Sequence, residues 1–249
     1  MKRCPILIIL VAVMAVKAMA GEKPFFDTTR SDDFIEVELH AMVGATTVGE
    51  NYADCIDALN ELHVTPGCGI GLGASVRFVI RDFLALGTQM DFRINNSRYD
   101  MTLVTPSERM STVYLSNHSY DVNLPIFMSF RFNVADNVRW YADGGVFFAL
   151  GFGGYQKADI YNTYNNSLGQ MVTSHVHEKH EYFRDEFPVI HNVADFDIGL
   201  HFATGLVFNR HYTAGVAMQI GLRDLADDTP VFAPEMRNRS CMLKIGYIF

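Results

Sequence analysis

Apolar and polar residues alternate with a period of two along most of the chain. From residue 69 to residue 81, every even position carries an aliphatic or aromatic side chain or alanine, whereas the odd positions carry glycine, serine, valine and arginine. This alternation is typical of a β-strand that has one apolar and one polar face. We predict eight strands on this pattern, at residues 34–44, 69–81, 84–95, 120–133, 138–153, 195–208, 212–223 and 241–249.

The connections between these predicted strands alternate between long and short. The long ones cover residues 45–67, 96–118, 154–194 and 224–239, and the short ones cover residues 82–83, 134–137 and 209–211. Outer-membrane barrels have short periplasmic turns and longer extracellular loops. We therefore predict an all-β fold, an eight-stranded antiparallel up-and-down transmembrane β-barrel. Alternating residues within 155–185 leave ten strands open as an alternative.

The polar face of the predicted strands carries charges of both signs in near balance. The opposite face holds too many large apolar side chains to fill the narrow interior of an eight-stranded barrel. We therefore expect the apolar face to contact lipid and the charged face to fill the lumen with ion pairs. The predicted lumen ion-pair network contains Glu36, Glu38, Arg77, Asp91, Arg93, Asp121, Arg131, Arg139, Asp143, Asp195, Asp197, Arg223 and Lys244.

The last nine residues, CMLKIGYIF, have an apolar residue at every second position up to Phe249. We predict that this stretch closes the barrel against the first strand, with Leu243 and Ile245 facing lipid. Tyr247 and Phe249 would then belong to an aromatic girdle at the periplasmic interface.

The first twenty residues have the pattern of a secretory signal peptide. A positive Lys2-Arg3 pair precedes an apolar run over residues 6–16, and a small-x-small cleavage pattern ends at Ala20. An uncleaved anchor helix is the alternative, but the run is short for a bilayer span. We predict a signal peptide at 1–20, cleaved before Gly21, a periplasmic N-terminal segment at 21–33 and an outer-membrane β-barrel at 34–249.

Charge and cysteine content narrow the possible partners and cross-links. The formal net charge of -8 argues against a nucleic-acid partner. Export permits a disulfide between Cys55 and Cys68, which would leave Cys241 unpaired. The alternative is that all three cysteines are small apolar fillers, because connectivity cannot be read from sequence.

Two clusters near the predicted outer rim are candidate chemical sites. His118 and Ser119 are adjacent, so in a strand they point to opposite faces and do not form a catalytic dyad. The longest loop is rich in histidine and glutamate without the H-E-x-x-H spacing, which favours a solvated loop over a metal site. Its candidate ligands are His175, His177, Glu178, His180, Glu181 and His191.

One helix is predicted in the first long loop, where residues 54–62 read DCIDALNEL, a short capped amphipathic pattern. This helix is expected to pack within the loop. No motif points to a cofactor, a metal ion or catalysis, so we expect that the protein is not an enzyme.

Four segments resemble the PorT-like outer-membrane β-barrel domain proteins typical of Bacteroidota. They read LPIFMSFRF, WYADGGVFFALGFGG, DFDIGLHFATGLVF and the terminal KIGYIF. The resemblance covers nearly the whole mature chain and implies a Gram-negative outer-membrane location, with no assigned activity for most members. It further implies that barrel-assembly machinery recognises a C-terminal insertion signal made of Leu243, Ile245, Tyr247 and Phe249.

These observations predict a cell-envelope component of the outer membrane with a filled lumen. Its role would be structural, surface-binding or associated with assembly or secretion. The expected partners are outer-membrane lipid, the barrel-assembly machinery during biogenesis and an envelope protein of unknown identity. The alternatives are a rim-acting lipid or peptide hydrolase and a small-solute transport barrel.

Overall fold

A computed structural model describes residues 24–30, 34–50, 59–104, 110–166, 168–183, 193–225 and 236–249. The predicted signal peptide at 1–20 lies outside the described residues, as does part of the predicted segment 21–33, so both stay predictions. Within the described residues no helix is both long and apolar enough to span a membrane.

The described chain consists of antiparallel strands. Eight of them close into a ring in which each strand pairs with its neighbours in sequence, except that β5 pairs directly with β7. The ring closes because β9 pairs with β1, from Glu38 opposite Ile248 to Glu50 opposite Met236. The predicted eight-stranded up-and-down fold is confirmed. The strands are β1 (Ile35–Glu50), β2 (Leu59–Arg81), β3 (Leu84–Val104), β4 (Met110–Ala135), β5 (Val138–Asn165), β6 (Met171–Glu181), β7 (Phe196–Phe208), β8 (Tyr212–Gly221) and β9 (Met236–Ile248).

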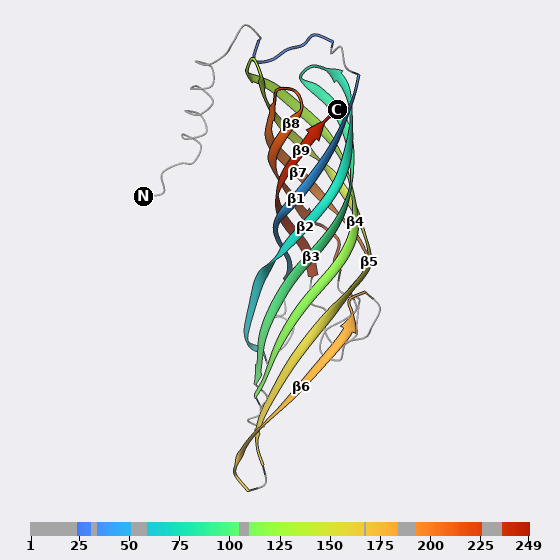
Figure 1. The fold of residues 1–249 in the computed structure, drawn as a ribbon. Helices are drawn as coiled ribbons and strands as arrows, with labels where there is room; N and C mark the ends of the chain where they lie inside the picture. The colour runs from blue at the N-terminus through green and yellow to red at the C-terminus, as the bar shows by residue number, and fades with distance from the viewer. Residues whose placement is uncertain are drawn as a thin grey trace, which may run out of the picture.

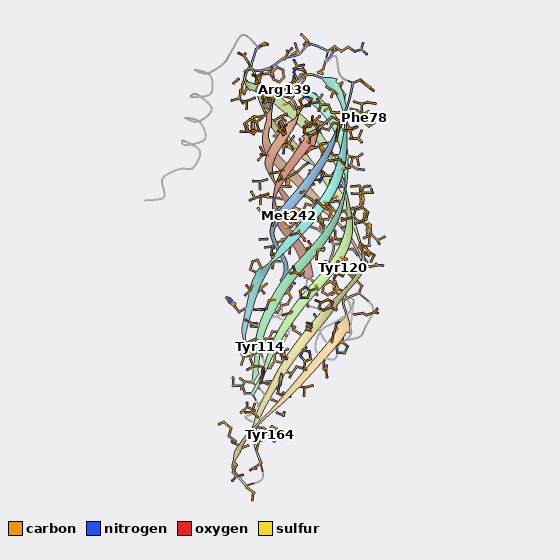
Figure 2. The ribbon with its side chains drawn as sticks, in the orientation of Figure 1. Phe78, Tyr114, Tyr120, Arg139, Tyr164 and Met242 are labelled. Atoms are coloured by element: carbon orange, nitrogen blue, oxygen red, sulfur yellow. The ribbon has the colours of Figure 1, made fainter. Side chains whose placement is uncertain are left out.

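Most ring strands are longer than the sequence pattern predicted, because large parts of the expected long loops are paired, whereas β7 and β8 are not longer than predicted. Strands β2 to β5 continue far past the ring and, with β6, form an open sheet at one end of the molecule (Figure 1). We call this open sheet the extension, and the opposite end, where the short connections lie, the turn end. Figure 2 shows Arg139 and Phe78 at the turn end and Tyr164 near the tip of the extension.

The ten-strand alternative is wrong. Strand β5 pairs with β7 only over Val138–Leu150, and it pairs with β6 over Tyr155–Asn165. The β5–β6 hairpin therefore adds a strand to the extension and none to the ring.

The predicted helix at 54–62 is contradicted where the structure describes it. Residues 59–62 belong to β2 and pair with β3, and residues 51–58 lie outside the described chain. Cross-strand pairing overrides the local helical pattern here.

The polarity of the buried side chains reverses along the long strands, and this reversal divides the molecule into two tiers. In the ring, outward side chains such as Leu72 and Phe92 are 66% and 55% exposed, while inward Asp91 and Arg93 are buried. Farther along β3 the inward Tyr99 is buried instead. The ring has an apolar exterior and a polar interior, whereas the extension has the arrangement of a soluble protein.

A glycine-rich bulge in β5 shifts its pairing with β4 by one residue at the boundary between the ring and the extension. The pairing between β4 and β5 shifts by one residue between Tyr120 and Asp121, where β5 contains an extra residue next to Gly153. At Gly154 the backbone φ is +149°, and a Cβ there would lie 2.2 Å from the carbonyl oxygen of His118. After the bulge the buried positions of β5 change from odd to even numbers, ending with Ala158.

The inward apolar side chains of the extension form a compact core at the mouth of the ring. Tyr99 and Met101 from β3 meet Val113 and Leu115 from β4. The connections near residues 182, 193 and 225 complete this core with Tyr182, Val193 and Leu225. This core adjoins the polar interior of the ring, because Asp121 and Asp197 line the same small cavity as Tyr182 and Val193.

The apolar exterior predicts a strong position dependence for inserted charge. Replacing Leu72 by Arg places a cation near the middle of the apolar belt, where lipid-facing Arg costs about 2–4 kcal/mol. The matched control is Thr102→Arg, which adds the same charge to the outward face of β3 in the extension. We expect Leu72→Arg to lower the free energy of unfolding in lipid vesicles by that amount, and the control to change it by less than about 0.5 kcal/mol. Equal effects of the two substitutions would contradict the two-tier arrangement.

Candidate functional site

Glu38 is the centre of the polar network that fills the ring. Its side chain is 0% exposed and accepts hydrogen bonds from the β2 residues Arg77 (2.5 Å) and Ser75 (3.2 Å). It also accepts one from Thr213 on β8 (2.8 Å), and Lys244 on β9 lies 3.2 Å from it. One carboxylate of β1 therefore joins four strands across the lumen.

Arg77 extends this network to the opposite wall. Its Nη2 lies 3.7 Å from Asp143 on β5, and its guanidinium stacks over the rings of Phe127 and Tyr141, at 5.6 and 5.8 Å from their centroids. The planar group thus contacts two carboxylates and two aromatic rings.

Asp91 forms a second centre near the first. His40 Nε2 lies 2.8 Å from one oxygen, and Gln89 donates to the other at 2.6 Å. Lys244 donates to Gln89 at 3.1 Å and so joins the two centres. The network therefore recruits neutral side chains that share the inward face.

Arg93 anchors a third centre, closest to the extension. It donates to Asp121 at 2.8 Å and to Gln219 at 2.5 Å, and Asn95 also donates to Asp121. Asp197 is buried nearby on β7, and neither of its carboxylate oxygens makes a hydrogen bond to another described residue.

Two ion pairs lie at the turn end. Arg131 on β4 is 2.7 Å from Glu36 on β1, and Arg139 on β5 is 3.3 Å from Asp82 in the β2–β3 turn. Asp82 was not among the predicted lumen residues, because it lies in a turn and has no strand periodicity.

The structure places two of the predicted lumen residues outside the network. Asp195 and Arg223 are exposed, and Arg223 donates to the backbone oxygen of Phe196. Both lie at strand ends next to the extension, where inward-facing positions are no longer enclosed by the ring. Conversely, His40, Gln89 and Gln219 belong to the network but were not predicted. They could have been predicted to face the lumen, because each lies an even number of residues from a charged residue on the same predicted strand and therefore shares its face.

Three histidines of the long predicted loop, His175, His177 and His180, lie in the strand β6. His175 Nε2 and His177 Nδ1 lie 3.0 and 2.9 Å from the same oxygen of Asp159 on β5. Hydrogen bonds from His177 and then His175 lower the pKa of Asp159 below its ordinary value of 3.8. Among the described residues no three or more His, Cys, Asp or Glu side chains are placed to hold a metal ion, and His191 lies outside them.

His118 and Ser119 diverge in the structure. The His118 ring packs in a tilted arrangement against Tyr155, with 4.5 Å between the ring centroids, on the outward face of the extension, whereas Ser119 lines a small cavity on the inward side. The pair therefore does not present a hydroxyl and an imidazole to one substrate, which is the arrangement that nucleophilic catalysis requires.

The cysteines and the C-terminal strand have defined positions. Cys68 and Cys241 are free, exposed thiols that both lie opposite Ala45 in register, and Cys55 is outside the described residues. The C-terminal side chains face outward from the ring, and their role as an insertion signal stays a prediction. Their exposed fractions are 60% for Leu243, 65% for Ile245, 38% for Tyr247 and 69% for Phe249.

Comparison with models of known protein families gives no match, and no curated protein matches the chain. The resemblance to PorT-like proteins of Bacteroidota therefore stays a prediction.

Several solved structures of bacterial surface and outer-membrane proteins are similar to the chain. The attachment invasion locus protein Ail of Yersinia pestis, solved with the heparin analogue sucrose octasulfate, is 12% identical with a TM-score of 0.33. That match covers 87% of this chain and 100% of Ail. Neisserial surface protein A is 10% identical with a TM-score of 0.33, covering 87% of this chain and 98% of that one. The outer membrane protein OprG of Pseudomonas aeruginosa is 11% identical with a TM-score of 0.41, covering 91% and 99%. At these values the function has to be argued from this chain's own residues.

The network predicts that Glu38 carries much of the stability of the ring. Glu38→Gln keeps the size of the side chain but leaves Arg77 and Lys244 as buried cations without their shared carboxylate. Breaking a buried pair in this way costs about 3–5 kcal/mol. Urea unfolding in lipid vesicles should show this loss, and Asp159→Asn, which removes an exposed carboxylate, should leave the unfolding midpoint unchanged. An unaltered midpoint for Glu38→Gln would show that the hydrogen bonds and ion pairs of Glu38, the hub of the network, do not stabilise the ring.

Proposed function

We propose that the chain is a non-conducting outer-membrane β-barrel that holds a surface-binding sheet outside the cell. The observation that carries this proposal is the two-tier reversal of polarity along continuous strands. A strand such as β3 can expose Phe92 in one half and bury Tyr99 in the other only if the surroundings change from apolar to aqueous along its length.

The exterior of the ring supports the membrane location. Large apolar side chains on every ring strand are exposed, and a soluble protein of this size rarely exposes so continuous an apolar surface. A closed barrel satisfies its backbone hydrogen bonds internally, which the bilayer core requires. At the turn end, aromatic pairs such as the stacked Phe132 and Trp140 and the edge-to-face Tyr212 and Tyr247 support an interfacial aromatic girdle. We therefore assign the turn end to the periplasm and the extension to the outside.

The filled lumen favours a non-transporting role. Glu38, Arg77, Asp91, Arg93 and Lys244 cross the interior and are bonded to one another or to polar neighbours. The apolar core of the extension then lies beside the outer end of this network. A solute would have to break these buried contacts, so we favour a structural and binding role over the transport alternative. The divergence of His118 and Ser119 likewise favours a non-enzymatic role over a rim hydrolase.

The extension offers a surface for a polypeptide partner in the envelope or outside the cell. Strand β6 pairs with β5 on one side and, within the described chain, with no strand on the other. The backbone groups of such an edge form the surface to which an extended peptide adds as a further strand. The PorT-like resemblance implies a role in secretion or assembly. Such a role, with a partner of as yet unassigned identity, is an extension of this proposal.

The filled lumen predicts electrical silence. The purified chain, inserted into a planar bilayer, should give no unitary conductance steps, whereas a porin inserted in parallel should give them. Steady single-channel steps that scale with salt concentration would instead support the transport alternative.

The binding role predicts that the edge of β6 is required for partner contact. Residues 160–176 can be replaced by Asn-Gly, because Asp159 and His177 are directly opposite and suit a two-residue turn. The matched control replaces residues 166–170 by Asn-Gly, between the opposed Asn165 and Met171, and keeps the edge. Cross-linking on intact cells should recover a partner with the wild type and the control but not with the shortened hairpin. Equal recovery from all three would contradict the role of β6.

A further inference from the structure

A cavity of about 490 Å³ lies at the turn end of the ring. Its walls come from the N-terminal segment, the β2–β3 and β7–β8 turns and the ends of β1, β4, β5, β7 and β9. The N-terminal segment is held in place by backbone bonds from Asn133 to Phe25 and from Asp82 to Thr29, at 2.9 and 3.1 Å. The volume falls within the range of small-molecule sites.

The charged lining of this cavity has an excess of arginine. Counting side chains alone, four arginines and three acids line it, a balance of 4 − 3 = +1 with His211 neutral. The α-carboxylate of Phe249, the last residue of the sequence, adds one negative charge at the same end. The whole chain, in contrast, has a net charge of -8. The arginines are Arg30, Arg131, Arg139 and Arg210, and the acids are Asp27, Glu36 and Asp82.

Two of the acids are already committed to partners. Glu36 is bonded to Arg131 and Asp82 to Arg139. The third, Asp27, accepts hydrogen bonds from the backbone and hydroxyl of Thr29. Among the residues that the structure describes, Arg30 and Arg210 make no ion pair, so their guanidinium groups are available to a ligand.

Arg131 provides the buried part of the site. Its side chain is 5% exposed, and only its Nη1 is bonded, to Glu36 at 2.7 Å. Its Nε and Nη2 are buried and make no hydrogen bond within the described chain. A buried guanidinium with unused donors is costly unless an acceptor meets it. These two atoms form an edge suited to bidentate binding of a carboxylate or phosphate.

Arg210 is held at the cavity by an unusual turn. Asn209 and Arg210 have φ values of 49° and 65°, so both central residues of the β7–β8 turn are left-handed. Asn-Gly is the favoured pair in such a turn, and glycine is preferred at the second position because it has no side chain to strain. A long cation occupies the position that favours glycine, which supports a binding role for its side chain.

We propose that this cavity binds a small anionic molecule from the periplasmic side through a phosphate or carboxylate group. Arg131 holds the anionic group by its free edge, and Arg30 and Arg210 reach it from the rim. The cavity volume of about 490 Å³ suits small molecules.

Calorimetry on the full chain in dodecyl maltoside tests this proposal, because that detergent carries no phosphate or charge that competes for the site. Pyrophosphate and citrate are the two probes, and trehalose is the neutral control. We expect saturable binding of pyrophosphate, citrate or both, weakening as sodium chloride is added. The probe that binds identifies the favoured group. Heat from trehalose equal to that from the anions, or no saturable binding of either anion, would overturn the proposal.

Variants locate the binding at the cavity. Arg30→Gln combined with Arg210→Gln changes only exposed side chains and should weaken binding about tenfold or more. Arg81→Gln removes an exposed arginine at the same end but outside the cavity, and should leave affinity unchanged. Arg131→Gln should weaken binding at least as much, and heat-modifiable gel mobility checks that it is folded. If the double variant binds as the wild type does, the cavity is not the site.

Discussion

The closure of the sheet by β9 against β1 is the constraint on which the rest of the structure depends. An open sheet edge exposes unpaired N–H and C=O groups, and in a bilayer each such group costs several kcal/mol. Once the ring is closed, its outer surface is free to be apolar, and polar side chains collect inside. The narrow interior of eight strands then requires those side chains to contact one another. The hub at Glu38 follows from this crowding, because cations from β2 and β9 have one shared carboxylate within reach.

In the extension, the same strands have the opposite distribution of side chains, with an apolar interior and a more polar outer face. In the proposed membrane setting water replaces lipid beyond the ring, so the inward positions of the same strands carry apolar residues such as Tyr99 and Leu115, and outward positions become polar or amphipathic. The bulge at Gly153 and Gly154 is the point where β5 adjusts to this change. The charged lumen, the apolar core beside it and the edge of β6 thus follow one another from the turn end to the extension, which we propose to be the periplasmic and the outer side.

Much of this arrangement is encoded in local patterns. Period-two alternation identified the ring strands, and the balance of charge on one face placed Glu38, Arg77 and Lys244 in the interior. Strand ends were missed because extended pairing beyond the membrane depends on neighbours, and residues 59–62 have a helical pattern that β3 overrides. The reversal of polarity was readable in principle. Tyr99 and Met101 share the parity of Arg93, so a switch from polar to apolar inward positions was visible in the sequence. The cavity at the turn end could not be predicted, because distant turns and the N-terminal segment meet there only in three dimensions.

Spin-label accessibility along β3 tests the central claim, the change of environment along continuous strands, most directly. Labels would be placed at outward positions from Leu86 to Thr102, in a chain whose native cysteines have been replaced, and the protein would be reconstituted in lipid vesicles. We predict that labels at Leu86, Met90 and Phe92 collide mainly with oxygen, which concentrates in the bilayer. Labels at Arg98 and Thr102 should collide mainly with a water-soluble nickel reagent. Access of the nickel reagent to Met90 and Phe92 equal to that at Thr102 would contradict the account.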